Sequence, residues 1–198
     1  MNPSPNQVEA HWESIRALSK PGGPLAPDSP YSTIRNQHWF AQSSAGAIVR
    51  KGRRALWTQI LSRAKQDASQ VPHDRKAIVL AGPPGAGKST IIHNVLGAGL
   101  KSYLIIDSDD FKHQLLGQAV EDGTYESEIK PPQVFDLEQA GEMFFPLELA
   151  SLTHEESARL AVELTRQALN IGVNVIHDRV LSWPQGAIQL GNVLEQAG

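Results

Sequence analysis

The sequence of 198 residues contains no cysteine, which excludes disulfide bonds and cysteine-ligated metal sites. It has no apolar run of membrane-spanning length, and its first seven residues lack the basic start and apolar segment of a signal peptide. The net charge of −3 shows no basic excess, so nothing indicates a nucleic-acid or membrane surface. These absences predict a soluble, cytoplasmic protein whose partners include neither nucleic acid nor membranes.

One stretch has the composition and spacing of a phosphate-binding loop. Ala77 to Ala81 is a short apolar run, typical of a strand buried on both faces of a parallel sheet. The next residues, from Gly82 to Ser89, fit the pattern G-x-x-x-x-G-K-[ST], and a helix is expected from Ile91 to Leu96. Glycines let successive N–H groups wrap an anion, and the helix start adds its own N–H groups. A glycine-rich turn without a ligand is the alternative.

The loop pattern assigns roles to individual residues. Lys88 is expected to reach the β- and γ-phosphates, and the Ser89 hydroxyl to ligate Mg²⁺. The expected cofactors are therefore ATP, or GTP, with Mg²⁺. The expected nucleotide contacts are Gly82, Pro83, Pro84, Gly85, Ala86, Gly87, Lys88, Ser89 and Thr90.

The rest of the chain alternates strand-like and helix-like segments. The expected helices are residues 7–19, 53–69, 111–118, a broken stretch over 133–152, 153–169 with a capping box at Thr153, and 185–196. The expected strands are 77–81, 102–106 and 173–176. Residues 117–132 are expected to be a surface loop, and 31–52 fit no regular structure clearly. Arg53 and Arg54 are interpreted as part of a solvated helix face rather than as a basic site.

This alternation predicts an α/β fold with a parallel sheet, flanked by helices, of the P-loop kinase type. The sequence favours two domains, an N-terminal extension over 1–52 with a strap rich in proline and glycine, and a core over 53–198. Polar residues follow each strand, and ligands of parallel sheets bind at the carboxyl ends of strands. A phosphotransferase is therefore favoured over a bare binding loop.

Acidic residues at these strand ends are the candidate catalytic and metal-binding groups. Asp109 is expected to act as a base, with Lys88 as the other catalytic residue. Asp107 and Asp178 are expected to hold Mg²⁺ together with Ser89. Helix capping is the alternative for Asp107, and a plain surface carboxylate is the alternative for Asp178. Asp110 is expected to face solvent, and His154 and His177 to be ordinary polar residues.

The run Ile78 to Thr90, followed by Leu104-Ile-Ile-Asp-Ser-Asp-Asp-Phe-Lys112, resembles the zeta toxin family. The resemblance covers residues 50–198 and is firmest over 76–112. It implies a kinase of UDP-N-acetylglucosamine, in which Asp109 deprotonates the sugar hydroxyl, and a small antitoxin protein as a partner. The sequence departs from the family at the third strand, which ends in His177-Asp178-Arg179 instead of a Glu-Gly-Thr type sequence.

The resemblance also implies a sheet order of 2-3-1-4-5, of which this chain supplies the first three strands. We therefore expect the fold to lack its C-terminal strands and the P-loop strand to lie at a sheet edge, with self-association or marginal stability. The phosphate-clamping arginines of the family are missing, and Arg179 is the nearest substitute, so no measurable kinase activity is expected of residues 1–198 alone. The alternatives are a P-loop kinase of another acceptor, such as an antibiotic or nucleotide, and a nucleotide-binding remnant without transferase activity. A regulatory NTP switch is less favoured, because it does not require the acidic block.

Overall fold

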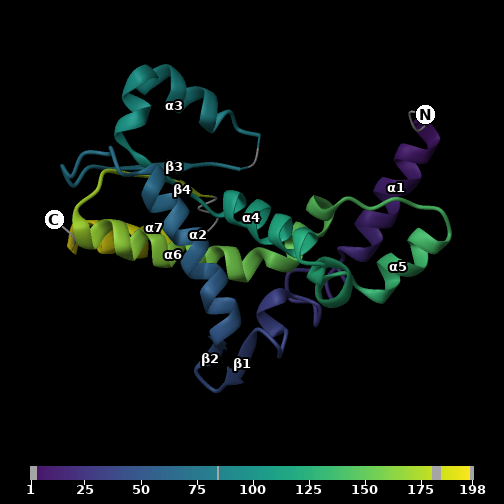
Figure 1. The fold of residues 1–198 in the computed structure, drawn as a ribbon. Helices are drawn as coiled ribbons and strands as arrows, with labels where there is room; N and C mark the ends of the chain where they lie inside the picture. Colours follow the sequence, from purple (N-terminus) through teal and green to yellow (C-terminus); the bar gives the residue numbers. More distant parts are fainter. Residues whose placement is uncertain (1–3, 84, 180–183, 197–198) are drawn as a thin grey trace. The chain divides into compact units, whose positions relative to one another are not determined.

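Helices make up most of the regular structure of the chain, which the computed structural model describes over residues 4–83, 85–179 and 184–196 (Figure 1). The chain divides into two units. The first unit consists of Met1–Leu56 and Asp109–Ala158, and the second unit consists of Trp57–Ser108 and Arg159–Gly198. The domain boundary that we place at residue 52 stays a prediction.

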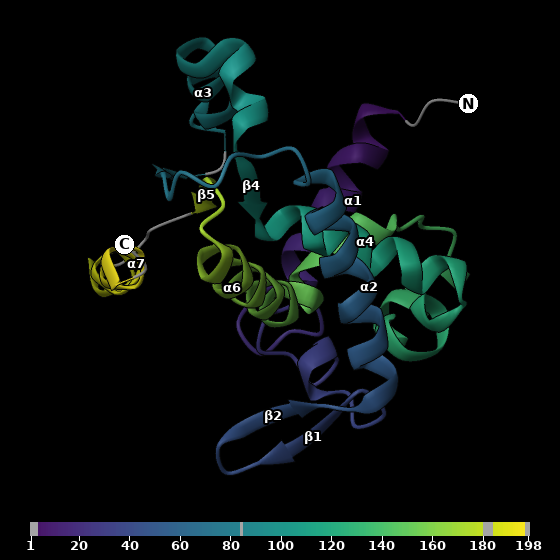
Figure 2. The same ribbon diagram turned by 60° about the vertical axis from the view of Figure 1, so that its left-hand side comes forward.

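The first unit begins with a helix whose start is fixed by a capping box. In α1 (Pro5–Leu18), the Ser4 hydroxyl accepts from the Gln7 amide, and the Gln7 side chain accepts from the Ser4 amide. The segment rich in proline and glycine that follows forms successive turns. A 3₁₀ turn, η1 (Thr33–Arg35), leads into an antiparallel hairpin of β1 (Phe40–Ser43) and β2 (Gly46–Val49), whose two strands lie side by side in Figure 2.

The remaining elements of the first unit surround a continuous apolar core. They are the start of α2 (Lys51–Asp67), most of α4 (Ser108–Glu121), a π-helical turn η3 (Tyr125–Ile129), α5 (Pro132–Gln139), the 3₁₀ segment η4 (Pro146–Thr153) and the start of α6 (His154–Ile171). The buried core residues are Leu25, Leu116, Ala119, Tyr125, Ile129, Val134, Phe144, Leu149 and Leu152.

The prediction of a surface loop over 117–132 is wrong. Helix α4 continues to Glu121, and Tyr125 and Ile129 are buried in the core of the first unit. These two residues are four positions apart, so one helical turn places both on the same face. Most residues of the segment are polar, so its composition predicted a loop and did not indicate this short apolar face.

The start of α6 agrees with the expected position but not with the expected contacts. The helix begins at His154, directly after Thr153. The Thr153 hydroxyl donates to the Ala150 carbonyl at 2.9 Å, and the Glu156 carboxylate accepts two hydrogen bonds from Arg53. These side chains therefore have partners other than those of the predicted capping box.

The second unit contains a three-stranded parallel sheet in the order β3-β5-β4. Its strands are β3 (Ala77–Ala81), β4 (Leu104–Asp107) and β5 (Val175–Arg179), and its helices include α3 (Lys88–Leu96) and α7 (Pro184–Gln196), with a 3₁₀ segment η2 (Gly97–Ser102) before β4. This confirms the predicted parallel α/β architecture, and the order matches the expected arrangement of the first three strands. Among the described strands, the P-loop strand β3 lies at an edge, as expected.

The expectation that β3 is buried on both faces is wrong. Its residues alternate between exposed and half-buried, and Val79 is 38% exposed. Strand β5 is the buried central strand instead, because it pairs with β3 on one side and with β4 on the other. Val175, Ile176 and His177 are all buried there.

Asn174 joins the segments that lead into the three strands. Its side-chain oxygen accepts from the amides of Asp74 (3.1 Å) and Lys76 (3.0 Å), and its side-chain amide donates to the Ser102 carbonyl (3.3 Å). Its own backbone carbonyl accepts from the Leu104 amide at 2.9 Å. Since Asn174 is buried, these bonds satisfy polar groups that water does not reach, and they set the register in which the strands start.

Candidate nucleotide-binding site

The loop between β3 and α3 has the backbone conformation that its glycines allow. Gly85 and Gly87 have φ values of 77° and 75°, in the left-handed region that residues with a Cβ rarely adopt. Gly87 directly precedes α3, which begins at Lys88, three residues earlier than predicted. The first amides of α3 therefore continue directly from the loop, an arrangement that favours anions. Pro84, one of the predicted contacts, lies outside the described residues.

Lys88 folds back over the loop that precedes it. Its ammonium donates to the carbonyls of Gly82 at 3.0 Å and Pro83 at 3.3 Å, and lies 3.4 Å from Asp178 Oδ1. The side chains of Lys88 and Asp178 are 15% and 19% exposed. The structure therefore brings together two predicted site residues that are 90 positions apart. Asp178 is therefore partly buried beside Lys88, and its role in holding Mg²⁺ stays a prediction.

The second predicted metal carboxylate is the register partner of Asp178. Asp107 on β4 lies opposite Asp178 on β5, and Leu80 on β3 lies opposite Asp178 on its other side. Strand β5 continues through Arg179, so the expectation that the strand stops at Ile176 is wrong. Because side chains alternate along a strand, His177 points to the other face from Asp178 and is buried beside Val79 and Ile106. The side chain of Arg179 lies outside the described residues.

Ser89, Asp107 and Asp178 fit a magnesium ion bound together with a nucleotide better than a metal site made by protein side chains alone. Within the described ranges, no group of three or more histidine, aspartate or glutamate side chains could hold a metal ion. Mg²⁺ commonly takes one or two protein oxygens and completes its shell with phosphates and water. Asp107, Asp178 and the hydroxyl of Ser89, in the first turn of α3, are oxygen donors of this kind. They are the residues that would hold the ion with a bound nucleotide.

Asp109, the predicted base, belongs to the first unit and lies in the first turn of α4. Its side chain is 66% exposed, and its Oδ1 accepts from the Lys112 ammonium at 2.7 Å. Asp110 is exposed, as expected. Helix α4 begins at Ser108 rather than at Phe111, which puts Asp107 directly before its first residue. The capping alternative for Asp107 thus stays open alongside the metal interpretation.

The interpretation of Arg53 as part of a solvated helix face is wrong. Arg53 is 5% exposed, and its guanidinium donates to both carboxylate oxygens of Glu156, at 2.7 and 2.9 Å. It also lies 4.0 Å from the ring centre of Trp39. Neither the spacing nor the charge of the segment indicates this partner, because Glu156 is 103 residues away. Arg54, its neighbour, is exposed.

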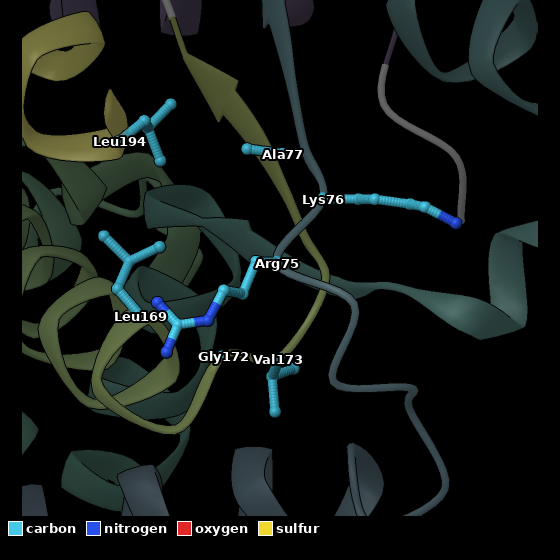
Figure 3. A pocket seen from close by; sticks show the side chains of 7 residues that line it. All are labelled: Arg75, Lys76, Ala77, Leu169, Gly172, Val173 and Leu194. Atoms are coloured by element: carbon cyan, nitrogen blue, oxygen red, sulfur yellow. The ribbon is translucent and has the colours of Figure 1, made fainter. Parts of the chain in front are cut away.

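A small pocket in the second unit lies away from the loop. Arg75, Lys76 and Ala77 line it at the start of β3, together with Gly172 and Val173 before β5, Leu169 on α6 and Leu194 on α7. Figure 3 shows the Arg75 side chain directed toward Leu169 and the Lys76 side chain extending away from it. These are the amino ends of the strands, whereas the P-loop follows the carboxyl end of β3. This pocket is therefore not the phosphate site.

One family model and one solved structure are similar to parts of this chain. Residues 58–122 match the family model described as zeta toxin, which is 65 of the 198 residues. The resemblance to the zeta toxin family is confirmed over this segment. The matched segment contains β3, the loop, α3, β4 and α4, and hence Lys88, Asp107 and Asp109. A comparison with curated proteins gave no match.

Among solved structures, the chain is similar to one from a study of the PezAT chromosomal toxin–antitoxin system of Streptococcus pneumoniae. The TM-score is 0.48 and the sequence identity is 17%, over 73% of this chain and 53% of that chain. This chain thus corresponds to about half the length of the pneumococcal chain.

The described helices include none that is both long enough and apolar enough to span a membrane. The second unit has a parallel α/β arrangement, and residues 58–122 are similar to the zeta toxin family.

Proposed function

We propose that this protein is an ATP-dependent phosphotransferase of the zeta toxin type. It transfers the γ-phosphoryl group to a hydroxyl of UDP-N-acetylglucosamine, in the cytoplasm. The observation that carries the proposal is the contact of Lys88 with Asp178, whose register partner is Asp107, after a loop with left-handed glycines. The match of residues 58–122 to the zeta toxin family supports the reaction class.

In the proposed reaction, the P-loop residues and the start of α3 bind the phosphates, and Lys88 offsets charge on the β- and γ-phosphates. Ser89, Asp107 and Asp178 would hold Mg²⁺, which would neutralise charge on the same phosphates. Asp109 accepts the proton of the acceptor hydroxyl. The affinities of the protein for ATP and for GTP, measured separately, would show which of the two nucleotides it prefers.

Nucleotide binding is the first test. Lys88→Ala should weaken ATP binding by about 10- to 100-fold, the range for a lost hydrogen bond to a charged group. Calorimetry of the wild type and the variant measures this. Lys76→Ala is the matched control, because Lys76 is an exposed lysine of the same unit that lies 3.3 Å from Asp74. Equal ATP affinity in the wild type and Lys88→Ala would contradict the P-loop assignment.

Phosphoryl transfer is the second test. Because residues 1–198 alone are expected to lack measurable activity, the intact-length protein is incubated with Mg·ATP and UDP-N-acetylglucosamine. The phosphorylated sugar nucleotide is measured by mass spectrometry. Asp109→Asn should retain ATP binding and lower turnover by about 10²-fold. Near wild-type turnover of Asp109→Asn would show that another residue is the base, and Asp107 would be the next candidate. Transfer to other hydroxyls alone would favour another acceptor, and ATP binding without any transfer would favour a nucleotide-binding remnant.

We also propose a small antitoxin protein as a partner. The support is the family match, since the description of that family names toxins. Co-expression of this chain with the product of a small neighbouring gene, followed by size-exclusion chromatography, tests the proposal. Separate elution of the two proteins would contradict it.

A further inference from the structure

Lys112 stands in the acidic block that the sequence singles out, but the proposed reaction gives it no role. Its ammonium donates to Asp109 Oδ1 at 2.7 Å, three residues back along α4. The two side chains differ in burial: Asp109 is 66% exposed, whereas Lys112 is 20% exposed. The lysine is therefore the more fixed member of the pair, and its contact limits where the exposed carboxylate points.

The charges around Lys112 give this contact a chemical consequence. Asp107, Asp109 and Asp110 place three carboxylates within four positions, and Asp109 and Asp110 share the first turn of α4. These like charges repel one another. The contact with the Lys112 ammonium opposes that repulsion and holds the Asp109 carboxylate close to Lys112.

We propose that Lys112 is a positioning residue, which holds the Asp109 carboxylate in one orientation for the phosphoryl-transfer reaction. The inference rests on the proposed function. In that reaction, the O–H bond of the acceptor breaks as its proton passes to Asp109, and the acceptor oxygen bonds to the γ-phosphorus. The bond from that phosphorus to the bridging oxygen breaks, and the bridging oxygen leaves with the electron pair on ADP. Lys112 touches none of the reacting atoms and acts through Asp109.

An ordinary helix-surface ion pair is the competing explanation, and the chain offers a matched control for it. Arg166 and Glu163 on α6 have the same spacing of three residues and a contact of 2.6 Å. Surface pairs of this kind contribute little to stability. Arg166→Met should therefore reproduce any general effect of losing such a pair, without a change at Asp109.

The experiment compares Lys112→Met, Lys112→Arg and Arg166→Met with the wild type, each in the intact-length protein. Lys112→Met should lower kcat by about 10- to 100-fold, the scale of a misplaced catalytic group, with KM for ATP unchanged. Lys112→Arg should recover most of kcat, and Arg166→Met should match the wild type.

A second measurement does not depend on turnover. Three-bond NMR couplings of the Asp109 side chain should show one χ1 rotamer in the wild type and averaging in Lys112→Met. Averaged couplings in the wild type would overturn the inference. So would an equal kcat of Lys112→Met and Arg166→Met, while loss of activity in Asp109→Asn would leave the proposed function intact. A wild type that binds ATP but transfers no phosphoryl group would overturn both.

Discussion

At the scale of single residues, two pairs of charged side chains form between segments that are distant in sequence. Lys88 meets Asp178, and Arg53 meets Glu156, across 90 and 103 positions. The first pair is half-buried beside a loop suited to phosphates. The second pair is fully buried in the first unit, where Trp39 also covers the guanidinium. The first pair therefore belongs to the candidate site, and the second to the structural core.

Removal of one partner of the buried pair should be costly. Arg53→Met leaves the Glu156 carboxylate, which is 0% exposed, without its bidentate partner. We expect a loss of about 3–5 kcal/mol in the free energy of unfolding. The double variant Arg53→Met/Glu156→Leu should recover a large part of that loss, because it leaves no buried charge. Urea unfolding measures both values.

The exposed neighbour provides the comparison. Arg54→Met should change the free energy of unfolding by no more than about 0.5 kcal/mol, as is usual for surface substitutions. A destabilisation of Arg53→Met no larger than that of Arg54→Met would show that the Arg53–Glu156 pair does not support the core.

At the scale of elements, α1 is attached to the first unit with none of its residues fully buried. Ile15 and Leu18 pack against the core, and His11 bridges two carboxylates, Glu142 at 2.8 Å and Glu148 at 2.9 Å. The ring also meets Phe144 edge-on, with ring centres 5.0 Å apart. Because each ring nitrogen faces a carboxylate, both nitrogens must carry a proton for both contacts to be hydrogen bonds.

The docking of α1 should therefore depend on pH. Burial alone lowers the pKa of His11, but the hydrogen bonds to Glu148 and Glu142 raise it above its ordinary value of 6.5. A raised folded-state pKa contributes stability that is complete below the unfolded-state value and is lost as pH rises through the folded-state value. Hydrogen exchange of the α1 amides, corrected for the intrinsic effect of pH, should show weaker protection at about pH 8 than at about pH 6.

His11→Gln should remove this pH dependence, because glutamine does not titrate. His113→Gln is the control, since His113 is an exposed histidine of α4 in the same unit. Equal pH dependence of α1 protection in the wild type and His11→Gln would assign the effect to other groups.

At the scale of the whole molecule, the chain forms two units, and the P-loop, α3, β4 and β5 all belong to the second. Among the described strands, its sheet has β3 at an edge and β5 at the centre. A nucleotide held by Lys88, Ser89 and the strand ends would bind only the folded second unit. Binding to the folded state alone raises stability by mass action.

Mg·ATP should therefore stabilise the protein, by about 2.7 kcal/mol at a ligand concentration of 100 times Kd. Thermal unfolding followed by fluorescence measures the rise in Tm. Removal of Mg²⁺ with EDTA should reduce the rise in Tm, because the phosphates, Asp107 and Asp178 would all bind the ion. The shift should also fall in Lys88→Ala but not in Lys76→Ala. An unchanged Tm at saturating Mg·ATP would contradict nucleotide binding to this unit.

Local chemistry was enough to predict the parallel strands, the loop and most of the helices. An apolar run predicts a strand wherever it lies, and the glycines that follow it predict a loop whose N–H groups can wrap an anion. The spacing to Lys88 predicts the lysine of a phosphate loop for the same local reason. The strand order also matched the expectation, which came from the family resemblance.

Tertiary structure alone decided which side chains meet and which are buried. Asp178 became the partner of Lys88 because β5 extends past Ile176 and lies between β3 and β4. Arg53 is buried because Glu156 compensates its charge, and residues 125–129 belong to the core because neighbouring elements cover one short face. A sequence pattern records what each residue prefers, whereas burial and pairing are decided by distant segments that fold against it.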